Sequence, residues 1–472
     1  MDRDSRIARH TSRRSAGIRL FFTLGLLVTA LFAVGFGAPA RAAAPSCPNT
    51  EALRVPGAEQ QKLACLDDLT TAGLVQTGHT NPADWAGLNA AGTQNPTGVA
   101  GVQIDGYFPD TSTFNTNNGW NHDAQFVIRL PNNWNGKLVI TGAPGVRRQY
   151  ANDFIISDWV LAQGYAFAST DKGNSGLFFF RDGVAPGDAV AEWHDRVTEL
   201  TIAAKAVVLQ HYRKPPKRTY ITGISNGGYL VRYALENSPW LYSGGVDWEG
   251  TLFLAEGPNL FTYLPATLKN YPRYAATRDQ AAFDALVAAG FPPESEFLWD
   301  FHYNVYWDLT QRIYREEFDP DYDGDLEAGI PFCSSGTPGC DADYDYANRP
   351  QAVKDAVAKV SLTGKIRRPL ITLHGALDAL LPISTDSDVY AELIEQARRS
   401  PLHRYYAVED GTHVDVLYDF FPDELRPILP CYRTAFTALE AWVESRGAER
   451  PPDSGFISRP DGGDLVNSCA LS

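Results

Sequence analysis

Basic residues are scarce in this sequence: 41 lysines and arginines stand against 56 aspartates and glutamates, a formal net charge of −15. The deficit is larger beyond residue 42, because seven of the arginines lie within residues 1–42. An acidic chain repels phosphate backbones and anionic lipid surfaces. The composition therefore excludes nucleic acid as a partner and favours a soluble protein.

The sequence also lacks Cys-x-x-Cys pairs and internal repeats, and it has one methionine in 472 residues. Its six cysteines all lie beyond residue 42. An even number of cysteines in an exported chain favours disulfides, and the missing Cys-x-x-Cys spacing argues against a zinc site. Proximity along the chain predicts the pairs Cys47–Cys65, Cys333–Cys340 and Cys431–Cys469.

An uncharged apolar run extends from Leu20 to Ala40, after a basic start and before Ala40-Arg41-Ala42. This order is typical of a signal peptide, so we expect residues 1–42 to be removed and the protein to be secreted, with no membrane attachment afterwards. The alternative is a retained anchor, since the run is close to the length of about 20 residues that spans a bilayer.

Short β-rich runs alternate with amphipathic stretches between about residues 124 and 260 and again near the C-terminus. This alternation predicts an α/β fold with a mainly parallel central sheet flanked by helices. The predicted strands are 125–130, 137–141, 165–169, 219–224, 251–255, 369–373 and 403–408, and the predicted helices are 153–163, 196–212 and 431–444. Residues 43–260 and 366–472 are therefore predicted to form one split core, with 261–365 as an inserted cap, or lid.

The strongest local signal is Gly223-Ile224-Ser225-Asn226-Gly227-Gly228, which follows the predicted strand 219–224. Glycines on both sides of a serine relieve the crowding of a tight strand-to-helix turn, which is typical of the nucleophile in the α/β-hydrolase fold. We therefore predict that Ser225 is the nucleophile and that the N–H of Asn226 contributes to an oxyanion hole.

A serine needs a base, and the base needs an acid to orient it. In this fold both come later in the chain, with the acid before the histidine. Asp378 and His413 follow predicted strands in that order and complete a predicted triad. The alternatives are His374 as the base and Asp386 or Asp388 as the acid. We expect His403 to lie at the wrong end of its strand, and Asp410 and Asp415 to be solvated loop charges.

The turn Gly142-Ala143-Pro144-Gly145 comes after an early predicted strand, where the second oxyanion donor is expected. Pro144 has no N–H, so the prediction falls on Ala143, with Gly145 in reserve. An ordinary Pro/Gly turn is the alternative.

Two features mark the predicted cap. Aromatic residues crowd positions 297–307 and either form its core or line a substrate pocket; they are Phe297, Trp299, Phe301, Tyr303, Tyr306 and Trp307. Next come the alternating oxygen ligands of an EF-hand-like calcium loop: Asp319, Asp321, Asp323, Asp325 and Glu327. Its twelfth position is Ile330, so ligands would have to come from Asp341, Asp343 or Asp345. We predict a structural calcium, against an exposed acidic loop, and no cofactor for catalysis.

The stretch Thr222–Gly228 resembles the nucleophile region of the poly(3-hydroxybutyrate) depolymerase and feruloyl esterase group, and the overall plan resembles the tannase and feruloyl esterase family. Tannase-type enzymes join a cysteine before the serine to one after the histidine, and here those positions are Ile224 and Val414. The resemblance implies a carboxylic ester substrate, either a phenolic ester or an aliphatic polyester and its oligomers. We therefore predict a secreted serine esterase. The alternatives are a serine peptidase of the same fold and an inactive binding protein.

Overall fold

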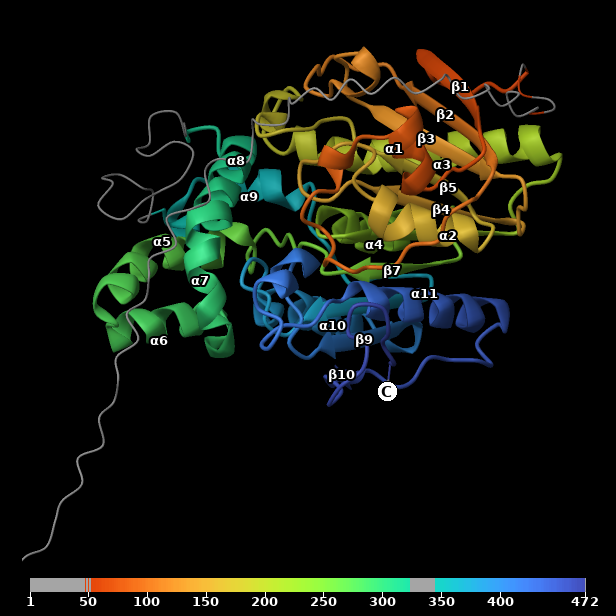
Figure 1. Cartoon of the computed structure of the whole chain (residues 1–472). Coiled ribbons are helices and arrows are strands. Elements are labelled where there is room, and N and C mark those ends of the chain that lie inside the picture. The colour runs from red at the N-terminus through yellow and green to blue at the C-terminus, as the bar shows by residue number, and fades with distance from the viewer. Residues whose placement is uncertain (1–46, 48–49, 51, 323–343, 472) are drawn as a thin grey trace, which may run out of the picture. The chain divides into compact units, whose positions relative to one another are not determined.

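A sheet of ten strands forms the core of the computed structural model, which describes residues 47, 50, 52–322 and 344–471 (Figure 1). Its spatial order is β1-β2-β3-β5-β4-β6-β7-β8-β9-β10. The pairs β1–β2, β2–β3 and β3–β5 are antiparallel, and the pairs from β5–β4 to β9–β10 are parallel. The strands are β1 (Gln60–Leu66), β2 (Gly101–Tyr107), β3 (Gln125–Pro131), β4 (Lys137–Gly142), β5 (Ala166–Thr170), β6 (Arg218–Ile224), β7 (Gly244–Trp248), β8 (Leu370–Gly375), β9 (His403–Val408) and β10 (Gly455–Ile457).

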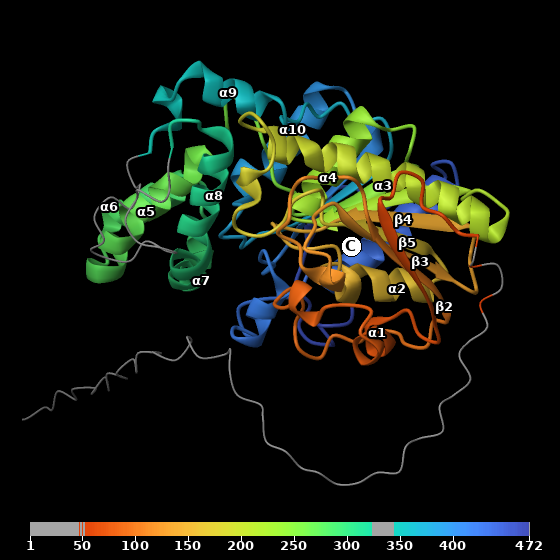
Figure 2. The same cartoon turned by 90° about the horizontal axis from the view of Figure 1, so that it is seen from above.

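Helices cover both faces of this sheet, because a parallel connection needs a crossover segment that returns to the same edge. Figure 2 shows α3 and α4 on one face and α1 and α2 on the other, where Trp159 of α2 packs edge-on against Phe436 of α11. The helices of the core are α1 (Thr71–Thr77), α2 (Asp158–Ala162), α3 (Asp188–Tyr212), α4 (Asn226–Asn237), α10 (Ser387–Gln396) and α11 (Leu429–Glu444).

The remaining α-helices of the described residues lie between β7 and β8. They are α5 (Leu260–Thr277), α6 (Gln280–Ala288), α7 (Glu296–His302), α8 (Asp308–Phe318) and α9 (Gln351–Ala358), with the π-helical turn η6 (Tyr303–Trp307) joining α7 to α8. Asn259 caps α5 through its side chain. The described residues form one compact unit, so these helices pack with the sheet.

One predicted strand is wrong. Residues 251–255 are not a strand, and the strand that follows β6 in the chain and pairs with it is β7, which the sequence pattern missed. Leu252 and Phe253 are apolar because they are buried in the loop after β7. There the N–H of Leu252 donates to Asp386 Oδ2 (2.7 Å), and the N–H of Leu362 donates to the carbonyl of Phe253 (3.1 Å).

The disulfides Cys47–Cys65 and Cys431–Cys469 are both present, which confirms two of the three predicted pairs. The predicted pair Cys333–Cys340, the predicted signal peptide 1–42 and the calcium-loop positions 323–327 lie outside the described residues. No helix within the described residues is long and apolar enough to cross a membrane.

Candidate active site

Ser225 lies on a tight turn between β6 and α4, with φ 57° and ψ −125°. Glycine is required around it: a Cβ on Gly223 would lie 2.5 Å from the backbone of Gly227, and one on Gly227 would lie 2.6 Å from the carbonyl oxygen of Gly142. Strained backbone of this kind persists only where the surrounding structure enforces it. The turn therefore has the conformation that the Gly-x-Ser-x-Gly motif predicted.

His413 and Asp378 lie next to Ser225, although 188 and 153 residues separate them from it in sequence. His413 Nε2 is 3.1 Å from Ser225 Oγ, and His413 Nδ1 is 2.8 Å from Asp378 Oδ2. The other oxygen of Asp378 accepts hydrogen bonds from the N–H groups of Leu380 (2.7 Å) and Leu381 (2.9 Å). The predicted serine, histidine and aspartate are thus brought together as one hydrogen-bonded chain.

Asp378 is fully buried, and its surroundings decide its charge. Burial opposes ionisation, but His413 and His374 outweigh this effect and hold the pKa of Asp378 below its ordinary value. The carboxylate therefore stays ionised over the physiological range. In this state it accepts the Nδ1–H of His413 and leaves Nε2 free to accept a proton from Ser225.

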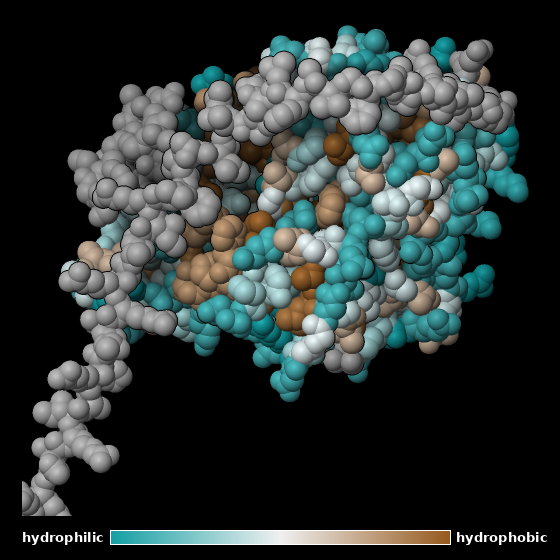
Figure 3. All heavy atoms as spheres, viewed as in Figure 1, coloured by the Kyte–Doolittle hydropathy of each residue, from teal (hydrophilic) through white to brown (hydrophobic). Residues whose placement is uncertain are grey.

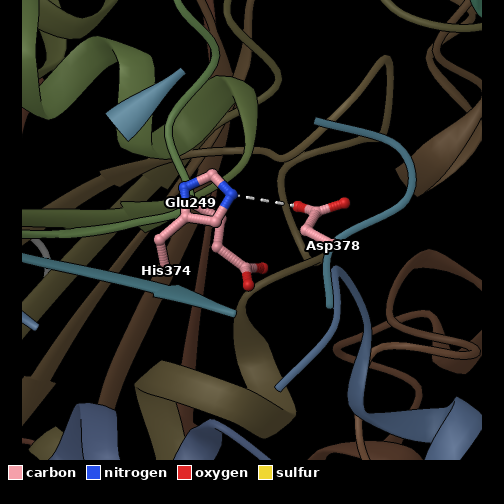
Figure 4. Close-up of side chains that lie close together, drawn as sticks. All are labelled: Glu249, His374 and Asp378. Carbon is pink, nitrogen blue, oxygen red and sulfur yellow. Dashed lines mark ion pairs between the residues drawn. The ribbon is translucent and has the colours of Figure 1, made fainter. Parts of the chain in front are cut away.

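The rival residues have other partners. His374 is buried, with Nδ1 2.7 Å from Ser387 Oγ and Nε2 2.8 Å from the carbonyl of Leu381 and 3.4 Å from Asp378 Oδ2 (Figure 4). Asp386 pairs with the buried Arg232 at 2.7 Å, and Asp388 accepts the hydroxyl of Tyr405. His374 therefore supports the acid and does not face the serine.

Two loop residues near the histidine behave differently from each other. Asp410 pairs with Arg459, as a loop charge does. Asp415 is buried and accepts the N–H groups of Ile428 and Leu429, so the prediction that it is a solvated charge is wrong. It satisfies backbone donors where α11 begins.

The two predicted oxyanion donors, Asn226 and Ala143, differ in whether their N–H groups already have a partner. Asn226 is the first residue of α4, where backbone N–H groups have no partner within the helix. Ala143 donates its N–H to the carbonyl of Thr170 on the neighbouring strand (3.0 Å), so it is not a free donor, which corrects the prediction. Gly145, the reserve candidate, lines the cavity beside Ser225.

A cavity of about 190 Å³ opens beside Ser225 and His413. Its core side is formed by apolar residues that include Ile224, Leu380, Leu381 and Val414, and its cap side by Tyr306, Leu309, Ile313 and Tyr314. Hydrophobic residues also gather on the visible surface where the cap meets the core (Figure 3). The positions of the tannase cysteines thus hold aliphatic side chains that line this cavity.

Of the predicted aromatic cluster, Tyr306 lines the cavity. Trp299 and Trp307 are fully buried among other cap aromatics, and the indole N–H of Trp307 donates to the carbonyl of Ala379 at 2.6 Å. This contact joins the cap to the loop that carries Asp378. The cluster is mainly packing, with one residue at the site.

The side chain of Asn226 joins three segments around the nucleophile. Its Nδ2 donates to the carbonyl of Gly145 (3.0 Å) and to Tyr314 Oη (2.5 Å), and its Oδ1 accepts the hydroxyl of Thr251 (2.9 Å). The turn that holds Gly145, the loop after β7 and the cap helix α8 are therefore held together beside Ser225. Sequence reasoning assigned only the backbone of Asn226.

Two of the aspartates proposed as calcium ligands, Asp319 and Asp345, have hydrogen-bond partners of their own. Both oxygens of Asp319 accept from Arg349 (2.6 and 2.8 Å), and Oδ2 also accepts from Tyr344. Asp345 accepts the N–H of Ala347 and the amide of Asn348. A calcium ion would have to share Asp319 with Arg349. The calcium site stays a prediction, and a melting temperature that is unchanged by calcium would contradict it.

Two other groups of acidic or histidine side chains come close together within the described residues: Glu249 with His374 and Asp378, and Asp110 with Asp182 and Glu192. The first shares Asp378 with the candidate triad. In the second, Arg196 lies 2.7 Å from Glu192 and 3.4 Å from Asp110 and compensates the charge. Neither group needs a metal ion to explain it.

The strand order, the crossover helices and the turn at Ser225 define an α/β-hydrolase fold, as predicted. The crystal structure of an esterase from Aspergillus oryzae superimposes on this chain with a TM-score of 0.50 at 14% identity, covering 85% of this chain and 88% of that one. Feruloyl esterase B from the same organism aligns with a TM-score of 0.49 at 13% identity, over 84% of this chain and 91% of that one.

The family model described as "Tannase and feruloyl esterase" matches residues 111–237, which include the turn at Ser225. A probable feruloyl esterase from Arthroderma benhamiae is 26% identical over 176 residues, 34% of this chain and 31% of that protein. The matched segment thus spans about a third of that relative. The predicted resemblance to the tannase and feruloyl esterase group is confirmed.

Proposed function

We propose that this chain is a secreted serine carboxylic ester hydrolase that acts through an acyl-enzyme. The observation that carries the proposal is the hydrogen-bonded chain Ser225–His413–Asp378 at the wall of an apolar cavity. Each residue follows its own strand of the sheet, and the positions suit a nucleophile, a base and an orienting acid.

In the first step His413 Nε2 takes the proton of Ser225 Oγ, which attacks the ester carbonyl carbon. The N–H groups of Asn226 and Gly145 hold the oxygen of the tetrahedral intermediate. The carbon–oxygen bond to the alcohol then breaks, and the alcohol leaves with the proton from His413.

Water completes the cycle. It attacks the acyl-enzyme while His413 accepts its proton, and the acid is released as Ser225 Oγ recovers that proton. Asp378 accepts the Nδ1–H of His413 throughout and balances the charge of the imidazolium. The apolar lining suits either a phenolic ester or an aliphatic polyester oligomer, the substrates that the family resemblance implies.

Secretion is part of the proposal. It is supported by the signal-like residues 1–42 and by the two disulfides, since disulfides persist in oxidising compartments. The N-terminal sequence of protein collected from the medium tests it, and we expect that sequence to begin at Ala43.

Hydrolysis of 4-nitrophenyl butyrate, compared with peptide anilides, tests the activity. We expect ester turnover, and we expect Ser225→Ala to lower kcat by roughly a million-fold while the melting temperature is kept. Cleavage of the anilides alone would indicate a peptidase. No turnover of either, or full activity of the variant, would contradict the proposal.

A further inference from the structure

A second carboxyl group lies behind the catalytic histidine, and the proposed mechanism does not use it. Glu249 comes directly after β7 and is fully buried, with a positive φ of 51°. Its Oε1 accepts the N–H of Gly375 at 2.7 Å. Its Oε2 is buried, has no hydrogen-bond partner among the described residues and lies 3.8 Å from His413 Nδ1. Figure 4 shows it beside His374 and Asp378.

The sheet topology explains why two acids meet at one histidine. β7, β8 and β9 are neighbouring parallel strands, so the residues after each strand come together at the same edge. Glu249 follows β7, Asp378 follows β8, and His413 lies in the loop after β9. The imidazole therefore has a carboxyl group from each of two adjacent strands near its Nδ1.

The two carboxyl groups cannot both ionise easily at this separation. His413 and His374 favour the charge on Asp378. Burial and the charges of Asp378, Asp415 and Asp247 raise the pKa of Glu249 well above its ordinary value, against the N–H of Gly375. The pair thus carries one negative charge, on Asp378, and Glu249 is the neutral member.

We propose that Glu249 is a second positioning acid for His413, which accepts the Nδ1–H when the carboxylate of Asp378 is removed. The inference rests on the proposed function. Without Asp378, Glu249 loses one of the charges that raise its pKa, so it ionises more easily than in the wild type. A movement of about 1 Å then brings Oε2 within hydrogen-bond distance of Nδ1.

Two substitutions of Asp378 distinguish a positioning role of Glu249 from a purely structural one. In Asp378→Asn the amide oxygen keeps the bonds to Leu380 and Leu381, so the NH₂ group faces His413 Nδ1 and forces the proton onto Nε2. That wrong tautomer typically costs about 10⁴ in kcat. In Asp378→Ala no donor faces Nδ1, and Glu249 is free to accept from it. We therefore expect the alanine variant to keep at least about tenfold more kcat/KM than the asparagine variant.

The decisive measurement is a double-mutant cycle of Asp378→Ala with Glu249→Gln, using 4-nitrophenyl butyrate. The amide keeps the shape of Glu249 but cannot ionise. We expect Glu249→Gln to cost at least about tenfold more kcat/KM in the Asp378→Ala background than in the wild type. In that background kcat/KM should also rise with pH as Glu249 ionises, and this rise should be absent from the double variant.

Glu236→Gln is the matched control. Glu236 is also a buried glutamate, but its partners are Thr363, Gly364 and Tyr390, and none of these is at the site. Its substitution should have the same effect in both backgrounds. If Glu249→Gln also costs the same factor in both backgrounds, the inference is wrong, while the loss of activity in Ser225→Ala still supports the proposed function.

A second readout applies if Asp378→Ala does not fold, because Asp378 also holds the backbone of Leu380 and Leu381. The alkaline limb of kcat/KM is then compared between the wild type and Glu249→Gln. We expect an additional rise in the wild type, since an ionised Glu249 stabilises the imidazolium of the transition state. Profiles that superimpose would overturn the inference.

Discussion

The two sides of the active-site cavity are built by different parts of the chain. Ser225, Asp378 and His413 follow strands of the central sheet, and buried hydrogen bonds hold them. The opposite wall comes from η6 and α8 of the insertion between β7 and β8. Among the described residues, its hydrogen bonds to the sheet side include Trp307 to the carbonyl of Ala379, in the loop of Asp378, and Asn226 to Tyr314. Under the proposed function, the sheet side supplies the reacting groups, and we expect the insertion side to influence which ester fits.

The largest effect should come from the sheet side. We expect His413→Ala to lower kcat by roughly a million-fold, since the base and the nucleophile act as one unit. His211→Ala, on α3, should leave the rate unchanged. Initial rates on short and long 4-nitrophenyl esters measure this. A loss of rate with only the short or only the long esters would show that His413 selects substrates. That result would contradict the assignment of the chemistry to the sheet side and of substrate selection to the insertion.

Asn226 lies between the two sides. Asn226→Ala removes the side-chain bonds to the turn of Gly145, to Tyr314 and to Thr251, so the second oxyanion donor loses its support. We expect kcat to fall by about 100-fold, comparable to the loss of an oxyanion donor. Asn237→Ala, at the other end of α4, is the control. A rise in KM without a fall in kcat would indicate that Asn226 affects substrate binding through its contact with the cap.

A smaller effect is expected from the cap side. Tyr314→Phe removes the acceptor for Asn226 Nδ2, and we expect kcat/KM to fall by no more than about tenfold, the value of one hydrogen bond. Tyr346→Phe removes another cap hydroxyl, which donates to the carbonyl of Ala255 away from the cavity. It should leave kcat/KM unchanged. Equal losses in both variants would indicate general loosening of the cap.

The smallest effect concerns stability. Because the pKa of Glu249 is raised above the ordinary value of 4.5, the folded chain keeps this proton when the unfolded chain has lost it. The contribution of Glu249 to the free energy of unfolding therefore falls as pH rises above about 4.5, by at most about 1.4 kcal/mol per pH unit. The glutamine of Glu249→Gln stays neutral. The melting temperature of this variant should therefore rise relative to that of the wild type as pH increases.

The exposed residue Glu256, in the loop between β7 and α5, provides the control for this measurement. We expect the pH-dependent gain of Glu249→Gln to be larger than any change that Glu256→Gln produces over the same pH range. A constant difference between Glu249→Gln and the wild type would show that Glu249 is already ionised in the folded protein.

Most of the catalytic side could be predicted because its signals are local. A β-rich run followed by glycines around Ser225 is a local signal of a tight strand-to-helix turn, and Asp378 and His413 each follow a recognisable strand. Glu249 was missed because β7, Gly244-Gly245-Val246-Asp247-Trp248, has few apolar side chains. The apolar run next to it belongs to a buried loop, and periodicity alone does not separate a buried loop from a strand.

By itself the sequence predicted the fold class and two disulfides, which are confirmed, and it named Ser225, Asp378 and His413, which the structure brings together. These predictions depend on short motifs, on proximity along the chain and on strand–helix alternation. Only the tertiary structure decided which N–H groups are free and which carboxyl groups meet. Ala143 loses its N–H to Thr170, 27 residues away, and Glu249 reaches His413 from another strand. Such contacts depend on strand order and register, which no local pattern encodes.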